Sequence, residues 1–172
     1  MNTGQSLFSI GALLLLSLTV LRVNNNILYT DTVLYDSKFG IIANSIATSM
    51  IEKAHEKFFD AKTAEGPVAN LSELTLPLGP GTGETNPDNF NDFDDFNNYT
   101  QNDTFFTSLV FYSKCNVVYV NPSIPNGLDN KVNTQTWHKK LTVSVTWRQN
   151  DQTTSFAVDT IKQSSIYSYW YF

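Results

Sequence analysis

The sequence predicts an α+β protein in which one long N-terminal α-helix carries a small antiparallel β-sheet. Three observations predict this fold. No charged residue occurs from Gly4 to Leu21, where apolar residues dominate. Apolar residues at helical spacing then continue to about Phe58. Apolar and polar residues alternate from Leu141 to Trp147, which is typical of a strand that buries one face.

The apolar N-terminal segment is nearly long enough to cross a bilayer. As a helix it would span roughly 27 Å, against about 30 Å for the hydrocarbon core. Its composition favours insertion by a few kcal/mol. No Lys or Arg precedes it and no small-residue cleavage pattern follows it at Arg22, so we expect it to remain as an inner-membrane anchor. The remaining chain is polar, aromatic and poor in Lys and Arg, and we expect it to be exported.

The helical pattern extends well beyond the membrane segment. No proline interrupts it before Pro67, so we expect one helix from about Gly4 to Ala61. The alternative is an anchor and a separate soluble helix, with a break near Asn24 to Asn26 or at Gly40. A single long helix cannot be covered by one small head, so its first half must be buried in lipid, in other copies, or in both. The apolar residues expected to form this assembly face are Leu7, Phe8, Ile10, Leu13, Leu14, Leu18, Leu21, Leu28, Tyr35, Phe39, Ile42 and Ile46.

We divide the chain into an apolar membrane or filament-core helix at 1–24, its amphipathic continuation at 25–65 and a globular β-rich head at 66–172. Within the head, residues 84–103 form an acidic loop that contains no Lys or Arg. Aromatic residues recur in this loop at every third position, at Phe90, Phe93, Phe96 and Tyr99. We therefore expect the loop to dock on the head instead of extending into solvent.

The β-rich part follows this loop. The strands expected are Phe105–Tyr112, Val117–Val120, Leu141–Trp147 and Thr153–Ile161, with a hairpin at Ser113–Lys114 between the first two. One face of the sheet should pack against the second half of the long helix. The chain closes with an unusually aromatic segment, residues 167–172, which we expect either to add an edge strand or to contact another molecule.

Composition argues against several functions. The net charge of −5 and the pI near 4.8 argue against nucleic acid as a partner, because such proteins present clustered Lys and Arg. Cys115 is the only cysteine, and we expect it to be a small buried side chain in a strand. His55, which we expect to be solvated, and His138 lack a nucleophile or a ligand set in the sequence. We therefore expect neither an enzyme nor a protein that requires a cofactor.

Two kinds of site nevertheless match short patterns. Asp92, Asp94 and Asp95 supply hard oxygen ligands that could coordinate calcium together with backbone carbonyls. The run lacks the spacing of an EF-hand, so the alternative that we favour is a solvated acidic loop without metal. The glycan acceptor pattern Asn-x-Ser/Thr begins at Asn70, Asn98 and Asn102.

The order of parts resembles the type IV pilin and type II secretion pseudopilin superfamily over the whole chain. Two stretches make the resemblance more specific. The sequence from Asp92 to Tyr99, DFDDFNNY, is similar to the D-D-x-D-D-[YF]-N-x-Y stretch of minor pilins of the mannose-sensitive haemagglutinin type. Residues 139–147, followed by 156–160, look like the last two strands of the same proteins.

The resemblance implies a short leader that is cut between Gly4 and Gln5, with the family's early glutamate replaced by Ser9. It also implies a structural filament subunit that packs its helix against copies of itself or related subunits, with the head facing outward on the cell surface. The alternatives are a minor pilin or pseudopilin that primes or tips such a fibre, and a membrane-tethered binding module that does not polymerise. Because some pseudopilins bind calcium in their heads, the resemblance adds some support to the calcium site.

Overall fold

The computed structural model describes residues 3–105, 109–149 and 160–170. It confirms the α+β fold class. The elements are α1 (Thr3–His55), α2 (Ala61–Glu65), the 3₁₀ helices η1 (Leu71–Glu73) and η2 (Phe93–Phe96), and the strands β1 (Thr100–Phe105), β2 (Leu109–Tyr119), β3 (His138–Gln149) and β4 (Thr160–Ser168). The structure divides into two compact units, residues 1–41 and 42–172. We call them the apolar helix segment and the head.

Helix α1 is helical through Asn24–Asn26 and at Gly40, so neither of the breaks considered occurs. It ends at His55, earlier than the sequence predicts. The end coincides with a backbone pairing to the acidic loop: the Phe58 N–H donates to the Asn91 carbonyl (3.2 Å), and the Phe93 N–H donates to the Phe58 carbonyl (2.8 Å). A pairing between segments far apart in the chain therefore overrides the local helical pattern.

The sheet is open, with four antiparallel strands in the order β1-β2-β3-β4. The expected hairpin at Ser113–Lys114 is wrong, because β2 runs straight through both residues. Buried and exposed side chains alternate along the whole of β2, from Leu109 to Tyr119, so this segment satisfies the pattern of one long strand. The polar residues of β1, most of which we had assigned to the acidic loop, form an edge strand on β2.

The expected strand Thr153–Ile161 lies almost entirely outside the described residues. Strand β4 begins at Thr160, pairs with β3 and forms the other edge of the sheet. The aromatic C-terminal segment begins within it, at Tyr167. Joining an edge strand is one of the two roles that we expected for this segment.

The core of the head lies between the last turns of α1 and one face of the sheet. The helix buries Ala43, Ala47, Met50 and Ala54, which lie on one face at spacings of four and three residues. Small side chains dominate this face, whereas the larger Ile41 is 71% exposed. The apolar pattern expected to continue to about Phe58 therefore coincides only in part with the buried face: Met50 and Ala54 are buried, Ile42 and Ile46 are half-buried, and Phe58 is 56% exposed.

The sulfur atoms of Met50 and Cys115 lie 3.8 Å apart in this core. Cys115 is fully buried on β2, which confirms the sequence prediction. Burial raises the pKa of its thiol to about 12.

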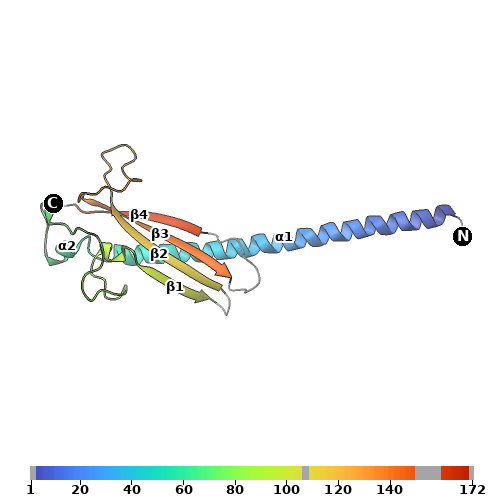
Figure 1. Ribbon diagram of the computed structural model, residues 1–172, viewed down its shortest axis with the longest axis horizontal. Helices are drawn as coiled ribbons and strands as arrows, with labels where there is room; N and C mark the ends of the chain where they lie inside the picture. Colours follow the sequence, from blue (N-terminus) through green and yellow to red (C-terminus); the bar gives the residue numbers. More distant parts are fainter. Residues whose placement is uncertain (1–2, 106–108, 150–159, 171–172) are drawn as a thin grey trace. The chain divides into compact units, whose positions relative to one another are not determined.

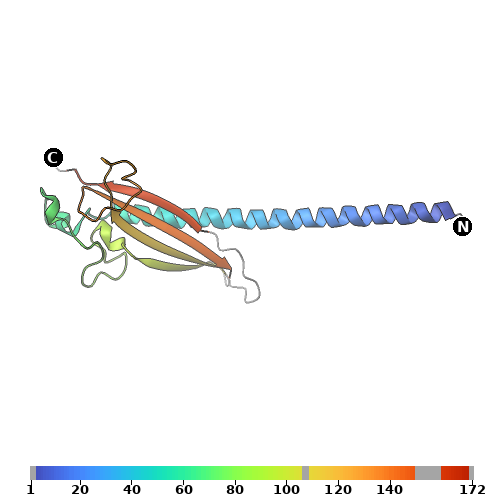
Figure 2. The same ribbon diagram turned by 45° about the horizontal axis from the view of Figure 1, so that its top comes forward.

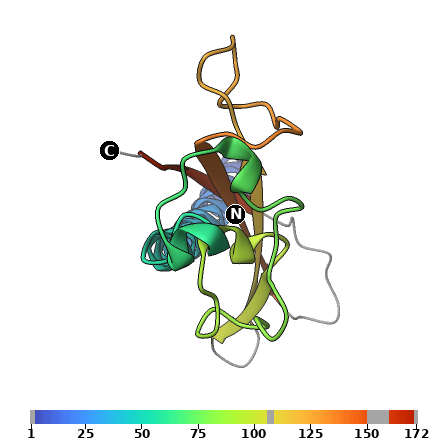
Figure 3. The ribbon, with the colours of Figure 1, turned by 90° about the vertical axis from the view of Figure 1, so that its left-hand side faces the viewer.

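Loops cover one end of the sheet. In Figure 2 the strands form a single layer with the last turns of α1 along one face. Figure 3 shows the segment from Gly66 to Tyr99, coloured green to yellow-green, folded across the end of the sheet, while the loop from Val120 to Trp137, in orange, projects beside it. The expectation that the acidic loop docks is confirmed, because Phe90, Phe93 and Phe96 are buried.

Candidate functional site

The first candidate site is the apolar helix segment itself. Its large apolar side chains are exposed from Leu7 to Tyr35 and again at Ile41; Phe8 is 84% exposed and Leu14 is 61% exposed. Among the described helices, α1 is long and apolar enough to cross a membrane. Exposed apolar area of this extent costs about 25 cal/mol per Å² in water, so the segment requires an apolar environment.

The expected assembly face is exposed as far as Tyr35, while Phe39, Ile42 and Ile46 are half-buried. Sequence reasoning missed that the remaining sides of the helix are also apolar and exposed. The additional residues are Leu15, Leu16, Val20, Val23, Ile27, Tyr29, Val33 and Leu34. The four consecutive leucines from Leu13 to Leu16 were the available signal, because adjacent residues on a helix point about 100° apart and four of them cover every side.

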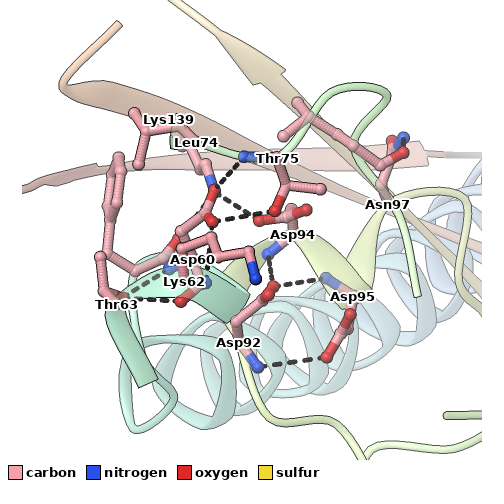
Figure 4. A network of polar contacts seen from close by, with 12 residues as sticks. Asp60, Lys62, Thr63, Leu74, Thr75, Asp92, Asp94, Asp95, Asn97 and Lys139 are labelled. Carbon is pink, nitrogen blue, oxygen red and sulfur yellow. Dashed lines mark hydrogen bonds and ion pairs between the residues drawn. The ribbon is translucent and has the colours of Figure 1, made fainter. Parts of the chain in front are cut away.

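The second candidate is a buried ionic cluster in the head, centred on Lys139 of β3 (Figure 4). The Lys139 side chain is completely buried. Its Nζ donates to Asp60 Oδ2 (2.7 Å), to the Phe59 carbonyl (2.8 Å) and to Asp94 Oδ1. The ammonium also lies over the rings of Phe59 (4.6 Å to the centroid) and Tyr119 (5.4 Å). A fully desolvated charge is tolerated here because carboxylates, a carbonyl and aromatic faces surround it.

Asp60 connects this cluster to the chain that follows α1. It is the N-cap of α2, and its Oδ1 accepts from the Lys62 N–H (3.1 Å). Thr75 donates to both carboxylate oxygens, from its hydroxyl to Oδ1 (2.8 Å) and from its N–H to Oδ2 (3.0 Å). Together with the Lys139 contact, these bonds tie α2 and the loop near Thr75 to the sheet.

The three aspartates predicted to bind calcium are buried, so the expectation of a solvated loop is wrong for them. Asp92 Oδ1 caps η2 by accepting from the N–H groups of Asp94 (2.8 Å) and Asp95 (3.3 Å). Asp95 Oδ2 accepts from the N–H groups of Asn91 (2.9 Å) and Asp92 (3.1 Å). Asp94 turns to Lys139 instead.

The three aspartates are close in sequence, but their carboxylates accept hydrogen bonds from different donors. Within the part of the chain that the structure describes, no group of three or more His, Cys, Asp or Glu side chains is placed to hold a metal ion. Calcium binding stays a prediction. The contacts observed have a structural role. Backbone N–H groups of the loop donate to Asp92 and Asp95, and Lys139 of β3 binds Asp94.

The cluster separates the pKa values of its carboxyl groups. Burial favours the protonated form of Asp60, but Lys139 and the hydrogen bonds to its oxygens outweigh burial and lower its pKa. For Asp94, burial outweighs Lys139 and raises the pKa. Burial, followed by the charges of Asp94 and Asp95, raises the pKa of Asp92 to about 8. Burial also raises the pKa of Asp95 to about 6. Burial and the neighbouring carboxylates therefore favour the protonated form of Asp92 in the folded head.

The two histidines have separate partners in the head. His55 is half-buried, so the expectation that it is solvated is wrong. Its Nε2 lies 2.7 Å from Ser165 Oγ, and its ring packs on Phe93. Burial lowers its pKa. His138 Nδ1 lies 2.8 Å from Ser168 Oγ.

The remaining predicted sites lie at the surface. The acceptor residues Asn70, Asn98 and Asn102 are exposed, although the Asn70 amide donates to Glu73 Oε1 (2.6 Å). Gly4 and Gln5 are exposed near the start of α1. Glycosylation and leader cleavage at these residues stay predictions.

A long apolar N-terminal helix whose last turns pack on a small antiparallel sheet is the arrangement that these observations establish. The architecture is pilin-like. No protein-family model matches the chain, and no curated protein or solved structure matches it.

Proposed function

We propose that this chain is a structural subunit of a pilus-like filament on the cell surface, anchored in the inner membrane before assembly. Its apolar helix segment packs against copies of itself or related subunits, and its head faces outward. The observation that carries the proposal is apolar exposure along α1 well beyond the length that a bilayer requires.

The lengths can be compared directly. Residues 3–41 of α1 span about 58 Å at 1.5 Å per residue, whereas the hydrocarbon core is about 30 Å thick. Val33, Leu34, Tyr35 and Ile41 are exposed in the second part of this length. A bilayer that covers the first part leaves these side chains in water, and neighbouring helices of a bundle would cover them.

The head supports the proposal through its self-sufficiency. It is a compact unit whose buried charges find their partners within the unit. Polymerisation through the helix therefore requires no rearrangement of the head, which agrees with a rigid domain displayed on the outside of a fibre.

A pair of substitutions in α1 tests the proposal against the simple membrane tether. Leu14→Asp places a charge inside the membrane segment, at a cost of about 2.5 to 3.5 kcal/mol for insertion, and should abolish insertion or filaments. Leu34→Asp lies about 20 Å beyond Leu21 along the helix, so it should leave insertion intact and abolish filaments. Thr134→Asp, on an exposed loop of the head, is the matched control.

The readouts are membrane fractionation and electron microscopy of material sheared from the cell surface. Filaments of normal yield from the Leu34→Asp chain would contradict the bundle and favour a tether that does not polymerise. Loss of filaments from the Thr134→Asp chain would show that the assay responds to any added charge.

A minor pilin or pseudopilin that primes or tips a fibre is the second candidate, favoured by the likeness of Asp92–Tyr99 to minor pilins. The aspartates of that stretch cap η2 and bind Lys139, so the likeness concerns how the head is built. Immunogold labelling separates the roles: a major subunit labels the whole fibre, and a minor one labels its tip.

A further inference from the structure

One face of the sheet points away from the last turns of α1. Side chains alternate between the two faces of each strand. The outward positions are every second residue, starting from Thr100 on β1, Val110 on β2, Lys140 on β3 and Thr160 on β4. Most of these residues are Thr, Ser, Asn or Lys, and we call this surface the outer sheet face.

The outer sheet face carries positive charge on a chain that is negative overall. None of its outward positions in the described strands is Asp or Glu, although the chain has 16 acidic and 11 basic residues. Lys114 and Lys162 are exposed and stand opposite Ser144 from its two sides, about 10 Å apart. Neither lysine forms an ion pair with a described residue. Lys140, by contrast, is paired with Asp129 (3.3 Å).

The complementary charge lies on another part of the same head. From Thr63 to Ser113 the chain contains eight acidic residues and no Lys or Arg. Some of these acidic residues belong to the buried cluster. Glu73 and Asp88 are exposed and form no ion pair with a described lysine or arginine. We call the exposed part of this segment, residues 65–91, the acidic loop surface; this range overlaps the acidic loop at 84–103 only in part.

We propose that the outer sheet face of one head docks on the acidic loop surface of a second copy of this chain. A contact between two different patches is heterologous. Such a contact builds an open helical filament when the rotation between neighbouring copies does not close into a ring. Electrostatic complementarity would set the register between the heads. The proposal rests on the proposed function only for its place between neighbours in a filament.

An anionic glycan or a nucleic acid is the competing occupant of a basic face. The chain itself supplies the complementary acidic surface, and this local complementarity favours a second copy.

Zero-length cross-linking detects the contact without polymerisation. The full chain is purified in detergent at fewer than one chain per micelle, as an equal mixture of ¹⁵N-labelled and unlabelled chains, and treated with a carbodiimide. We expect peptides of mixed isotope composition that join Lys114 or Lys162 to an acidic residue of 65–91. Their yield should fall several-fold in 0.5 M salt, because salt screens exposed charges. Joins elsewhere, or a yield that salt does not change, would overturn the proposal.

Charge exchange then tests specificity. Lys114→Glu with Lys162→Glu, and separately Glu73→Lys with Asp88→Lys, should each lower cross-linking between copies about tenfold, because each reverses attraction into repulsion and removes reactive groups from one side of the contact. Mixing the two variants should restore it. Lys53→Glu with Lys131→Glu, two exposed lysines away from the outer sheet face, gives the same net charge as the first variant and should cross-link as the wild type does.

The remaining outcomes decide between the proposals. Failure of the mixture to restore cross-linking would overturn the docking contact. The same is true if the Lys114→Glu/Lys162→Glu chain cross-links normally and instead loses retention on heparin or single-stranded DNA, since the face would then serve an anionic polymer. Specific cross-links without any filaments would overturn the proposed function alone, and filaments without these cross-links would overturn the docking contact alone.

Discussion

Leu14 and Lys139 reverse the usual relation between hydropathy and burial. The leucine, in the apolar helix segment, is 61% exposed, and the lysine, in the head, is fully buried. Burial of a side chain therefore depends on the partners available to it. Most large apolar side chains of the helix segment are exposed among the described residues, whereas the lysine has two carboxylates and a carbonyl within reach.

The comparison predicts that stability has different sources in the two regions. Substitutions around Lys139 should lower the stability of an isolated chain, and substitutions in the helix segment should not. All three tryptophans, Trp137, Trp147 and Trp170, belong to the head. Tryptophan fluorescence of the full chain in detergent therefore reports unfolding of the head.

Lys139→Ala should have the largest effect. It leaves Asp60 and Asp94 buried without their cation, and breaking a buried ion pair in this way costs about 3 to 5 kcal/mol. The midpoint of thermal unfolding should fall by roughly 10 to 20 °C. Lys140→Ala, at the next position but at the surface, should cost less than about 1 kcal/mol. Equal shifts for the two variants would show that the cluster contributes no more than a surface pair.

Asp92→Asn should change the pH dependence of stability. The folded-state pKa of Asp92, about 8, lies above its unfolded value, so the folded head binds the extra proton. Its contribution to stability is therefore fully present below about pH 4 and is lost as the pH rises through 8. Asparagine keeps an oxygen that can cap η2 and has no charge to bury.

The Asp92→Asn head should accordingly match the wild type near pH 4 and exceed it at pH 9, on the order of a few kcal/mol. Denaturant titrations at pH 4, 7 and 9 measure the difference. Asp88→Asn, at an exposed position in the same loop, serves as the control and should give a difference that does not grow with pH. A constant difference for Asp92→Asn would contradict a protonated Asp92.

Asp60→Asn and Asp94→Asn should differ although both residues bind Lys139. Both oxygens of Asp60 accept hydrogen bonds from two donors each, so an amide nitrogen at either position would face donors. We expect a loss of about 1 to 3 kcal/mol. Asp94 keeps its Lys139 contact as an amide; the change weakens a 3.4 Å bond from the Gly79 N–H and alters the side-chain hydrogen bond with Asp92, and the charge of Asp94 is disfavoured by burial. Its substitution should change the free energy of unfolding by less than about 1 kcal/mol, and a larger loss than for Asp60→Asn would reverse the assignment.

Leu14→Asp should give the smallest effect on the head. Its side chain lies in the other compact unit, so the unfolding midpoint followed by tryptophan fluorescence in detergent should change by no more than about 1 °C. A substantial fall would mean that the head depends on the apolar helix segment for its stability, contrary to the comparison.

Local patterns in the sequence predicted the long helix, the alternating strand β3 and the docking of the acidic loop through its aromatic residues. The end of α1 at His55 could not be predicted, because it depends on a backbone pairing between Phe58 and the distant acidic loop. Strand β1 was missed since its residues are polar and it forms only an edge. Only the end of α1 depends on a contact that is distant in sequence, because β1 pairs with the next strand along the chain.

The buried cluster was partly readable. Lys139 is in phase with the inward residues Leu141, Val143 and Val145 of β3, and that position predicts a buried lysine in need of an anion. The acidic run that contains Asp94 offered one of the two anions, although it lies 45 residues away in sequence. Which aspartate would meet the lysine depends on how the loop folds across the end of the sheet, and the sequence does not encode that locally.

Cys115 has a practical consequence for labelling. Its thiol is enclosed beside Met50, and its pKa of about 12 leaves almost no thiolate at neutral pH. Maleimide or methanethiosulfonate reagents should therefore spare it while the head is folded. A cysteine introduced at any exposed residue becomes the only reactive thiol, so fluorophores or spin labels can be attached one site at a time without first removing the native cysteine.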